Sequence, residues 1–262
     1  MRSAWQREQA GVAAVTDAFT QSQNDGPRHP DWLPGLEEFD LRILLKLPLI
    51  LALSLVPATF AAETSVPVLH SIPGPLEWKN APLNWTVDGT GALTITADKR
   101  TDWFISPLDG GKTENTPKLL FKPADDFVLS ALVTVDFRSQ WDAGVLILYA
   151  SDTVWAKLCF EMSIEKQPTI VSVVTRGLSD DSNSIAINGN SVFLKIAKIG
   201  QGIFFYASTD GKKWTIMRAF SLLPAQQIRA GFSSQSPQGE KCRTVFSEIE
   251  YRAVKVNPWT GE

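Results

Sequence analysis

The sequence predicts an all-β protein, built as an antiparallel β-sandwich or barrel. After residue 62 the chain divides into short runs rich in β-branched and aromatic residues, and Gly, Asn and Pro fall between them. No segment keeps an apolar stripe at helical spacing for three turns. At least about ten strands at this spacing are typical of antiparallel sandwiches. The expected strands are Trp85–Val87, Leu93–Thr96, Phe127–Phe137, Val145–Tyr149, Val154–Ile164, Thr169–Thr175, Val192–Ile196, Ile203–Ala207, Trp214–Phe220, Ile228–Phe232 and Thr244–Tyr251.

A secretory signal is predicted over residues 41–62. Basic residues precede an uncharged run from Leu47 to Val56, and small residues follow as far as Ala62. The run is about ten residues long, shorter than the roughly 20 that a membrane-spanning helix needs. A buried core helix is the alternative, which Pro48 and Pro57 at the ends of the run disfavour. Residues 1–40 show no period that buries a face, so we expect a disordered tail or an extension that precedes the true start of translation.

The signal implies a secreted or periplasmic protein whose mature part, residues 63–262, forms one domain without a membrane span. That part keeps 20 of the 25 basic and 21 of the 28 acidic residues, a near-neutral balance that argues against nucleic acid as a partner. An oxidising compartment would allow one disulfide, between Cys159 and Cys242, and two buried thiols are the alternative. No C-x-x-C or H-x-x-x-H spacing indicates a zinc site.

The run Val154–Ile164 can be resolved into two faces. Its even positions are the apolar residues from Ala156 to Met162, and its odd positions include Trp155, Lys157 and Glu161. Because strand side chains alternate, the even set is expected between the sheets and the odd set on the outward face. An indole, an ammonium and a carboxylate in one line are typical of sugar-binding grooves, although an ordinary solvated face has the same pattern.

Short signatures in order along the chain carry a resemblance to a known family. They are Thr101-Asp102-Trp103, Asp142-Ala143-Gly144, Trp155 with Lys157 and Glu161, Val173-Val174-Thr175, Ser179-Asp180, Ser208 with Asp210-Gly211 and Trp214, and Ser236-Pro237. With these, residues 78–252 resemble a bacterial and fungal family labelled after a yeast protein called regulation of enolase protein. The family is grouped with the concanavalin A-like lectin/glucanase sandwiches, so the resemblance implies a jelly-roll sandwich. The family often has Trp after the Ser-Asp pair, where this chain has Asp181.

Two of these signatures are expected to be scaffold. Asp210-Gly211 is what a tight hairpin turn requires, and Gly144 is expected to allow a close backbone approach. The functional prediction therefore rests on Trp155, Lys157 and Glu161, with Asp102 and Asp180 as neighbours. Thr175 joins them if the strand pairing brings it beside Lys157.

An active site is less clearly indicated. Glycoside hydrolysis needs two carboxylates about 5 Å or 6.5–9.5 Å apart, but Glu161 and Glu165 lie about 13 Å apart along one strand face. A pair across strands, such as Glu161 with Asp102 or Asp180, stays open. His70 is expected at the surface. Residues 179–183 form an oxygen-rich segment with a modest case for calcium, although such segments are usually turns; no other cofactor is indicated.

The sequence thus predicts an exported module that binds a carbohydrate, or another small extracellular ligand, on one sheet face. In this model Trp155 stacks on a sugar ring while the polar residues hydrogen-bond to it. A glycan-active hydrolase or lyase with Glu161 as acid or base is the first alternative. A protein-interaction or regulatory module is the second.

Overall fold

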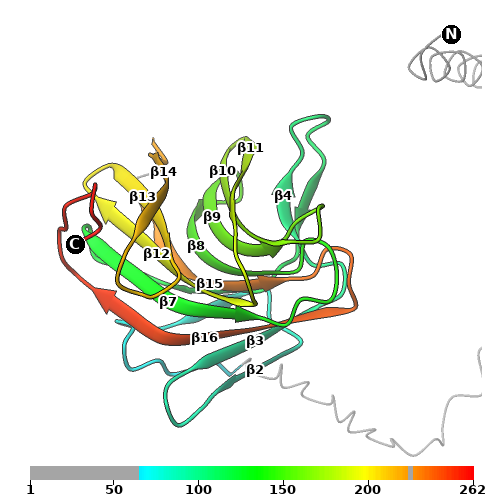
Figure 1. Cartoon of the computed structure of the whole chain (residues 1–262), viewed down its shortest axis with the longest axis horizontal. Helices are drawn as coiled ribbons and strands as arrows, with labels where there is room; N and C mark the ends of the chain where they lie inside the picture. The colour runs from blue at the N-terminus through cyan, green and yellow to red at the C-terminus, as the bar shows by residue number, and fades with distance from the viewer. Residues whose placement is uncertain (1–64, 224–226) are drawn as a thin grey trace, which may run out of the picture. The chain divides into compact units, whose positions relative to one another are not determined.

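Sixteen β-strands form two large sheets and one short ribbon in the computed structural model, which describes residues 65–223 and 227–262 (Figure 1). Sheet A has the order β1-β6-β15-β8-β9-β10-β11, and sheet B the order β14-β13-β12-β7-β16-β3-β2. The strands of sheet A are β1 (Glu77–Lys79), β6 (Lys118–Phe121), β8 (Ala143–Ser151), β9 (Val154–Met162), β10 (Pro168–Arg176), β11 (Leu178–Ala186) and β15 (Arg229–Gln235). Those of sheet B are β2 (Asn84–Val87), β3 (Leu93–Asp98), β7 (Phe127–Val135), β12 (Ser191–Ile199), β13 (Gly202–Ser208), β14 (Thr215–Phe220) and β16 (Lys241–Arg252). The ribbon pairs β4 (Trp103–Ile105) with β5 (Lys112–Glu114).

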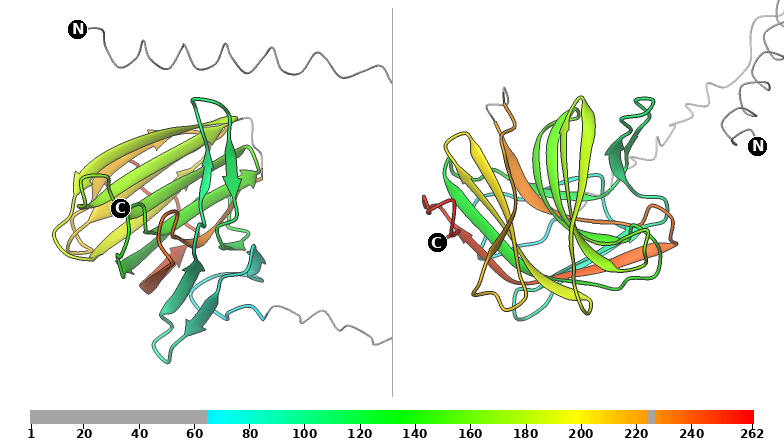
Figure 2. Two further views of the ribbon diagram at one scale, coloured as in Figure 1. Left: turned by 90° about the vertical axis from the view of Figure 1, so that its right-hand side faces the viewer. Right: turned by 45° about the horizontal axis from the view of Figure 1, so that its top comes forward.

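The predicted fold class is confirmed. All strand pairs are antiparallel, and the two sheets lie face to face as the layers of a sandwich (Figures 1 and 2). Each expected run overlaps one strand, and the strands that contain Trp85–Val87 and Leu93–Thr96 pair with each other. The described residues contain no helix long and apolar enough to cross a membrane. The predicted signal at 41–62 and the segment 1–40 lie outside the described residues.

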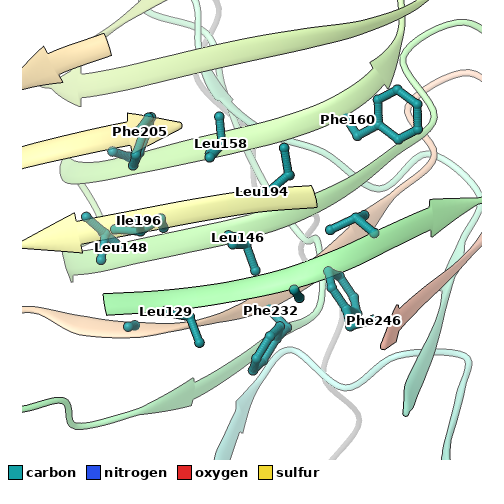
Figure 3. Close-up of a cluster of buried hydrophobic side chains, with 14 of the residues drawn as sticks. Leu129, Leu146, Leu148, Leu158, Phe160, Leu194, Ile196, Phe205, Phe232 and Phe246 are labelled. Atoms are coloured by element: carbon teal, nitrogen blue, oxygen red, sulfur yellow. The ribbon is translucent and has the colours of Figure 1, made fainter. Parts of the chain in front are cut away.

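The main core lies between the sheets (Figure 3). Leu146 and Leu158 of sheet A meet Leu129 and Leu194 of sheet B, and all four are fully buried. Burying such a side chain stabilises the fold by about 1.5–3 kcal/mol. The even positions of β9 enter this core as the alternation predicted, from Ala156 to Phe160.

The central strands of sheet A are buried on both faces. In β8, β9 and β10 nearly every residue is buried, including the odd positions that face away from sheet B. A second apolar cluster on that outward face explains this, because Trp103 and Ile105 of the β4 segment pack over Val145, Trp155 and neighbouring residues. Strands that are covered on both faces have continuous apolar sequences, and the segment AGVLILY of β8 is an example.

The Asp142-Ala143-Gly144 signature is scaffold, as predicted. A Cβ on Gly144 would lie 2.5 Å from Cγ2 of Thr244 and 2.6 Å from Cγ1 of Val133, so only glycine lets the sheets approach so closely. The Asp142 carboxylate is fully buried and accepts the Ser236 hydroxyl at 2.7 Å and the Ser139 backbone N–H at 2.9 Å. It thereby fixes the loop that enters β8.

The Ser208–Trp214 hairpin is also scaffold. Gly211 has φ 69°, and the Asp210 carboxylate accepts backbone N–H groups of Lys212 and Lys213, both at 2.8 Å. Trp214 packs beside the turn, with its ring 3.7 Å from the Lys195 ammonium. These contacts hold the turn between β13 and β14.

Candidate functional site

The outward face of β9 carries the predicted line of Trp155, Lys157 and Glu161, but that face is not open to solvent. The three residues are 0%, 3% and 9% exposed, respectively. The expectation of a solvated groove is therefore wrong for this strand. Trp103 and Ile105 of the ribbon pack on this face, and Trp155 lies in the same apolar cluster. Figure 2 shows the ribbon beside sheet A.

Trp155 is a buried structural residue rather than an exposed platform. Its indole stacks on Trp103 with a centroid separation of 4.1 Å and an interplanar angle of 25°. The ammonium of Lys118, on β6, lies 4.7 Å from the Trp103 ring, and the Lys157 ammonium lies 5.8 Å from the Trp155 ring. Burial lowers the pKa of Lys118 to about 8. The prediction that Trp155 stacks on a sugar is corrected, since the ring is fully buried beneath Trp103.

Thr175 anchors the ribbon. The register of β9 and β10 pairs it with Trp155, whereas Lys157 is paired with Val173, so Thr175 does not lie beside Lys157. Its hydroxyl lies 2.9 Å from the Ser179 hydroxyl, which in turn accepts the Ile105 backbone N–H at 2.9 Å. This chain of bonds ties β4 to sheet A.

Asp181, and not Asp180, belongs to the site. Neighbouring residues of a strand point to opposite faces, and the Asp180 carboxylate is 2.9 Å from the Arg218 guanidinium of β14. Asp181 faces the other way and lies in one row with Val173 and Lys157. Partial burial raises the pKa of Asp181 above its usual value.

A buried polar network lies at the centre of this face. The Lys157 ammonium donates to the Gln235 side-chain oxygen at 3.1 Å and lies 3.7 Å from the Asp102 carboxylate. The Gln235 amide nitrogen donates to the Glu161 carboxylate at 3.4 Å and to the Trp141 backbone oxygen at 3.3 Å. Asp102 and Glu161 are therefore joined through an ammonium and an amide.

The sheet register explains how Gln235 reaches Glu161. Gln235 on β15, Ala143 on β8 and Glu161 on β9 form one row across sheet A. The methyl group of Ala143 leaves room for the two longer side chains to meet above it. Asp102 is positioned from the ribbon side, where its carboxylate accepts the Trp103 backbone N–H at 2.6 Å and its backbone N–H donates to the Asn115 side chain at 2.9 Å.

A pocket of about 230 Å³ opens above this network. Its polar lining consists of Asp102, Lys157, Glu161, Asp181 and Gln235. Its apolar lining consists of Phe104, Trp141, Val173 and Pro237. Trp141 is 37% exposed, so it supplies an aromatic ring at the accessible side of the pocket.

Burial sets the protonation of the network. It raises the pKa of Glu161 from 4.5 to about 8, because the favourable charge of Lys157 only partly offsets the loss of hydration. Burial acts to lower the pKa of Lys157, but the charges of Asp102 and its other neighbours outweigh it, and the pKa is raised. At neutral pH the site therefore holds an ammonium beside a largely protonated carboxyl.

Neither a disulfide nor a calcium loop is found where the sequence allowed one. Cys159 and Cys242 are free and buried in different clusters, Cys159 on the outward face of sheet A and Cys242 between the sheets. Residues 179–183 belong to strand β11 rather than to a loop, so adjacent carboxylates diverge. Within residues 65–223 and 227–262, no three His, Cys, Asp or Glu side chains are grouped to hold a metal ion.

Four residues of the pocket were not predicted as part of the ligand site: Phe104, Trp141, Asp181 and Gln235. The motif positions pointed to their neighbours Trp103, Asp142, Asp180 and Ser236, each adjacent to one of the four in the sequence. If β11 had been recognised as a strand, the alternation of its side chains would have placed Asp180 and Asp181 on opposite faces of the sheet.

These features define a β-sandwich protein with a small polar and aromatic pocket on the outward face of one sheet. A family model described as "Protein of unknown function (DUF1349)" matches residues 78–254, and the chain belongs to this family. No curated protein matches the chain.

Solved structures with the same fold include a functionally unknown protein from Saccharomyces cerevisiae. It is 21% identical, with a TM-score of 0.64, and the match covers 69% of this chain and 97% of that protein. The GH43 protein BlXynB from Bacillus licheniformis is 17% identical, with a TM-score of 0.56 over 71% of this chain. A xylan beta-1,4-xylosidase from Bacillus halodurans C-125 is 15% identical, with a TM-score of 0.50 over 62% of this chain. The chain spans only 38% and 33% of those two proteins, and at these identities the likeness establishes the fold alone.

Proposed function

We propose that this protein is an exported β-sandwich module that binds one sugar unit of a carbohydrate in the pocket above Lys157, Glu161 and Gln235. The observation that carries the proposal is the pocket itself, which combines Trp141 and Phe104 with a buried hydrogen-bonding network. Pockets for drug-sized ligands measure about 300–1,000 Å³, and this pocket is smaller at about 230 Å³. A single ring is the ligand size that suits it.

Sugar recognition needs an aromatic ring for the apolar side of the ligand and fixed polar groups for its hydroxyls. Trp141 supplies the ring, and Glu161, Gln235 and Asp181 supply acceptors and donors in the lining. The fold likeness to a GH43 protein and a xylan beta-1,4-xylosidase is consistent with a role in glycan recognition. The concanavalin A-like classification suggested by the sequence signatures points the same way.

Export follows from the predicted signal at 41–62 and sets a secreted or periplasmic location as part of the proposal. Sequencing the N-terminus of protein recovered outside the cytoplasm tests it. A terminus near residue 62 or 63 supports export, whereas intact protein confined to the cytoplasm contradicts it.

A glycan-active enzyme is the second candidate because one observation favours it. Burial raises the pKa of Glu161 to about 8, so this carboxyl is protonated at neutral pH as a general acid must be. The Lys157 ammonium and the Gln235 amide, however, lie between Glu161 and Asp102. The Cα atoms of Glu161 and Asp181 are separated by about 16 Å on the sheet lattice of 3.3 Å per residue and 4.8 Å per strand. Binding without turnover is therefore preferred.

The test is a glycan array probed with the full chain, followed by calorimetry on the best sugar and an assay for new reducing ends. We expect Trp141→Ala to weaken binding at least tenfold. The matched control is Trp259→Ala, because Trp259 is 71% exposed and is not among the residues that line the pocket. It belongs to the C-terminal segment, which is hydrogen-bonded to sheet B, whereas the pocket lies on sheet A.

Each result of this test has a stated meaning. Binding without product that is lost in Trp141→Ala supports the module, and product that disappears in Glu161→Gln supports the enzyme. If no sugar binds at millimolar concentration, the proposed function is wrong, and a protein-interaction or regulatory module becomes the better hypothesis.

A further inference from the structure

The pocket has an unbalanced set of charges. Three carboxyl groups line it, on Asp102, Glu161 and Asp181, whereas Lys157 carries the one ammonium among its lining residues. Arg218 lies nearby but pairs with Asp180 at 2.9 Å. Lys118, on the same face of sheet A, lies against the Trp103 ring and donates to the Thr116 backbone oxygen at 3.2 Å. Neither of these cations lines the pocket.

Lys157 is not available to an anionic ligand. Its side chain is 4% exposed, and its ammonium is already engaged by Gln235 at 3.1 Å and Asp102 at 3.7 Å. A uronate or phosphate entering the pocket would find three carboxyl groups in its lining and no free cation there. Like charges brought together in a poorly hydrated site repel strongly.

Glu161 is the carboxyl of the pocket that is poorly satisfied by hydrogen bonds. Its carboxyl is held by a single long contact, from Gln235 at 3.4 Å, and no contact to its second oxygen is formed by the described residues. The residue is 9% exposed and lines the pocket, so a ligand donor can reach the remaining lone pairs. The titratable groups that face it are Lys157 on its own strand, Asp102 before β4 and Asp181 on β11.

Aromatic rings complete the environment. Trp141 and Phe104 line the same pocket, and indole and phenyl faces attract cations as well as the C–H faces of sugars. Uncompensated carboxyls together with aromatic rings are the chemistry that recognises a primary ammonium carried on a ring.

We propose that the sugar recognised by this pocket carries a free, protonated amino group, which sits against Glu161 while the ring lies against Trp141. This inference rests on the proposed function and specifies its ligand class. N-acetylation removes the positive charge, and a carboxylate reverses it, so both changes should reduce affinity.

Proton release accompanies binding in this model. Burial raises the pKa of Glu161 and, less strongly, that of Asp181, so that Glu161 is largely protonated in the empty pocket at neutral pH. An ammonium bound against Glu161 favours the carboxylate and expels the proton. Affinity should therefore rise with pH toward about 8, as long as the amine of the ligand itself stays protonated.

The experiment compares four methyl glycosides of one ring configuration: glucosamine, N-acetylglucosamine, glucose and glucuronic acid. Calorimetry with the full chain, in two buffers of different ionisation enthalpy near pH 7, gives both the affinity and the number of protons released. We expect the glucosamine derivative to bind at least tenfold more tightly than the other three, with release of a measurable fraction of one proton.

Two variants test the assignment. Glu161→Gln should abolish proton release and most of the preference for the amino sugar. Asp181→Asn removes a more distant carboxylate on the edge strand β11, and it should reduce the preference by a smaller factor. The control is Glu165→Gln, an exposed carboxylate four residues from Glu161, which should change neither quantity.

The outcomes separate this inference from the function on which it rests. Equal affinity for glucose and glucosamine, or tightest binding of glucuronate, overturns the inference and leaves sugar binding intact. Binding of the amino sugar that is unchanged in both variants also overturns it. No binding of any of the four, together with a silent glycan array, overturns the proposed function as well.

Discussion

Glu161→Gln should stabilise the protein in a pH-dependent way. The pKa of this carboxyl rises from 4.5 in the unfolded chain to about 8 in the folded protein because it is buried. Between those limits the folded state binds the extra proton, so the free energy of unfolding falls as pH rises, by up to about 1.4 kcal/mol per pH unit. Over the whole interval the limit is roughly 5 kcal/mol.

Glutamine reproduces the protonated form of Glu161, with one acceptor for Gln235 and one donor group, but it does not ionise. At pH 4.5 or below the variant and the original protein should therefore be about equally stable. Above pH 8 the variant should be more stable by a few kcal/mol. Lys157 does not reverse this sign, because its pKa is raised and it remains an ammonium throughout the interval.

The assay is urea unfolding followed by tryptophan fluorescence, at half-unit steps of pH from 4.5 to 9. Glu165→Gln serves as the control, since Glu165 is exposed, and its curve should run parallel to that of the original protein. A Glu161→Gln variant that is less stable by the same amount at every pH would refute the reasoning. It would show that the carboxylate is ionised and compensated in the folded state.

Three further predictions concern the scaffold. Gly231→Ala should prevent correct folding, because a Cβ at Gly231 would lie 1.8 Å from a backbone oxygen of β6, whereas Gly89→Ala meets nothing within 4 Å and should leave the melting temperature nearly unchanged. Thiol labelling should leave Cys159 and Cys242 unmodified in the folded protein and modify both after denaturation without reductant; failure of both to react after unfolding would show a disulfide. Trp103→Ala should cost about 3–5 kcal/mol of stability in urea unfolding; a loss below about 1 kcal/mol would show that the ribbon does not pack there.

The strands that could be predicted from the sequence are those with an apolar face. The missed strands of the sandwich and its ribbon are β1, β4, β5, β6 and β11, and most are three or four residues long. The exception is β11, whose sequence LSDDSNSIA is polar because it forms an edge of sheet A with most side chains exposed. Charged residues on edge strands hinder pairing with other chains, so the composition of β11 resembled that of a loop.

The site was predicted in part. Alternation along β9 correctly assigned Lys157 and Glu161 to one face, but it did not reveal that the ribbon covers Trp155. A local period reports which side of a sheet a residue occupies, and not what packs against that side. Gln235 was missed for a related reason, since its contact with Glu161 depends on the order β15-β8-β9, which joins segments 74 positions apart.

The stack of Trp103 on Trp155 has a spectroscopic consequence. Two indoles whose centroids lie 4.1 Å apart couple their electronic transitions, and the flanking ammonium groups of Lys118 and Lys157 shift those transitions further. The pair should give a distinct near-ultraviolet circular dichroism signal. Because Trp103 belongs to the ribbon and Trp155 to sheet A, that signal reports whether the ribbon is packed against sheet A, and it does so without any ligand.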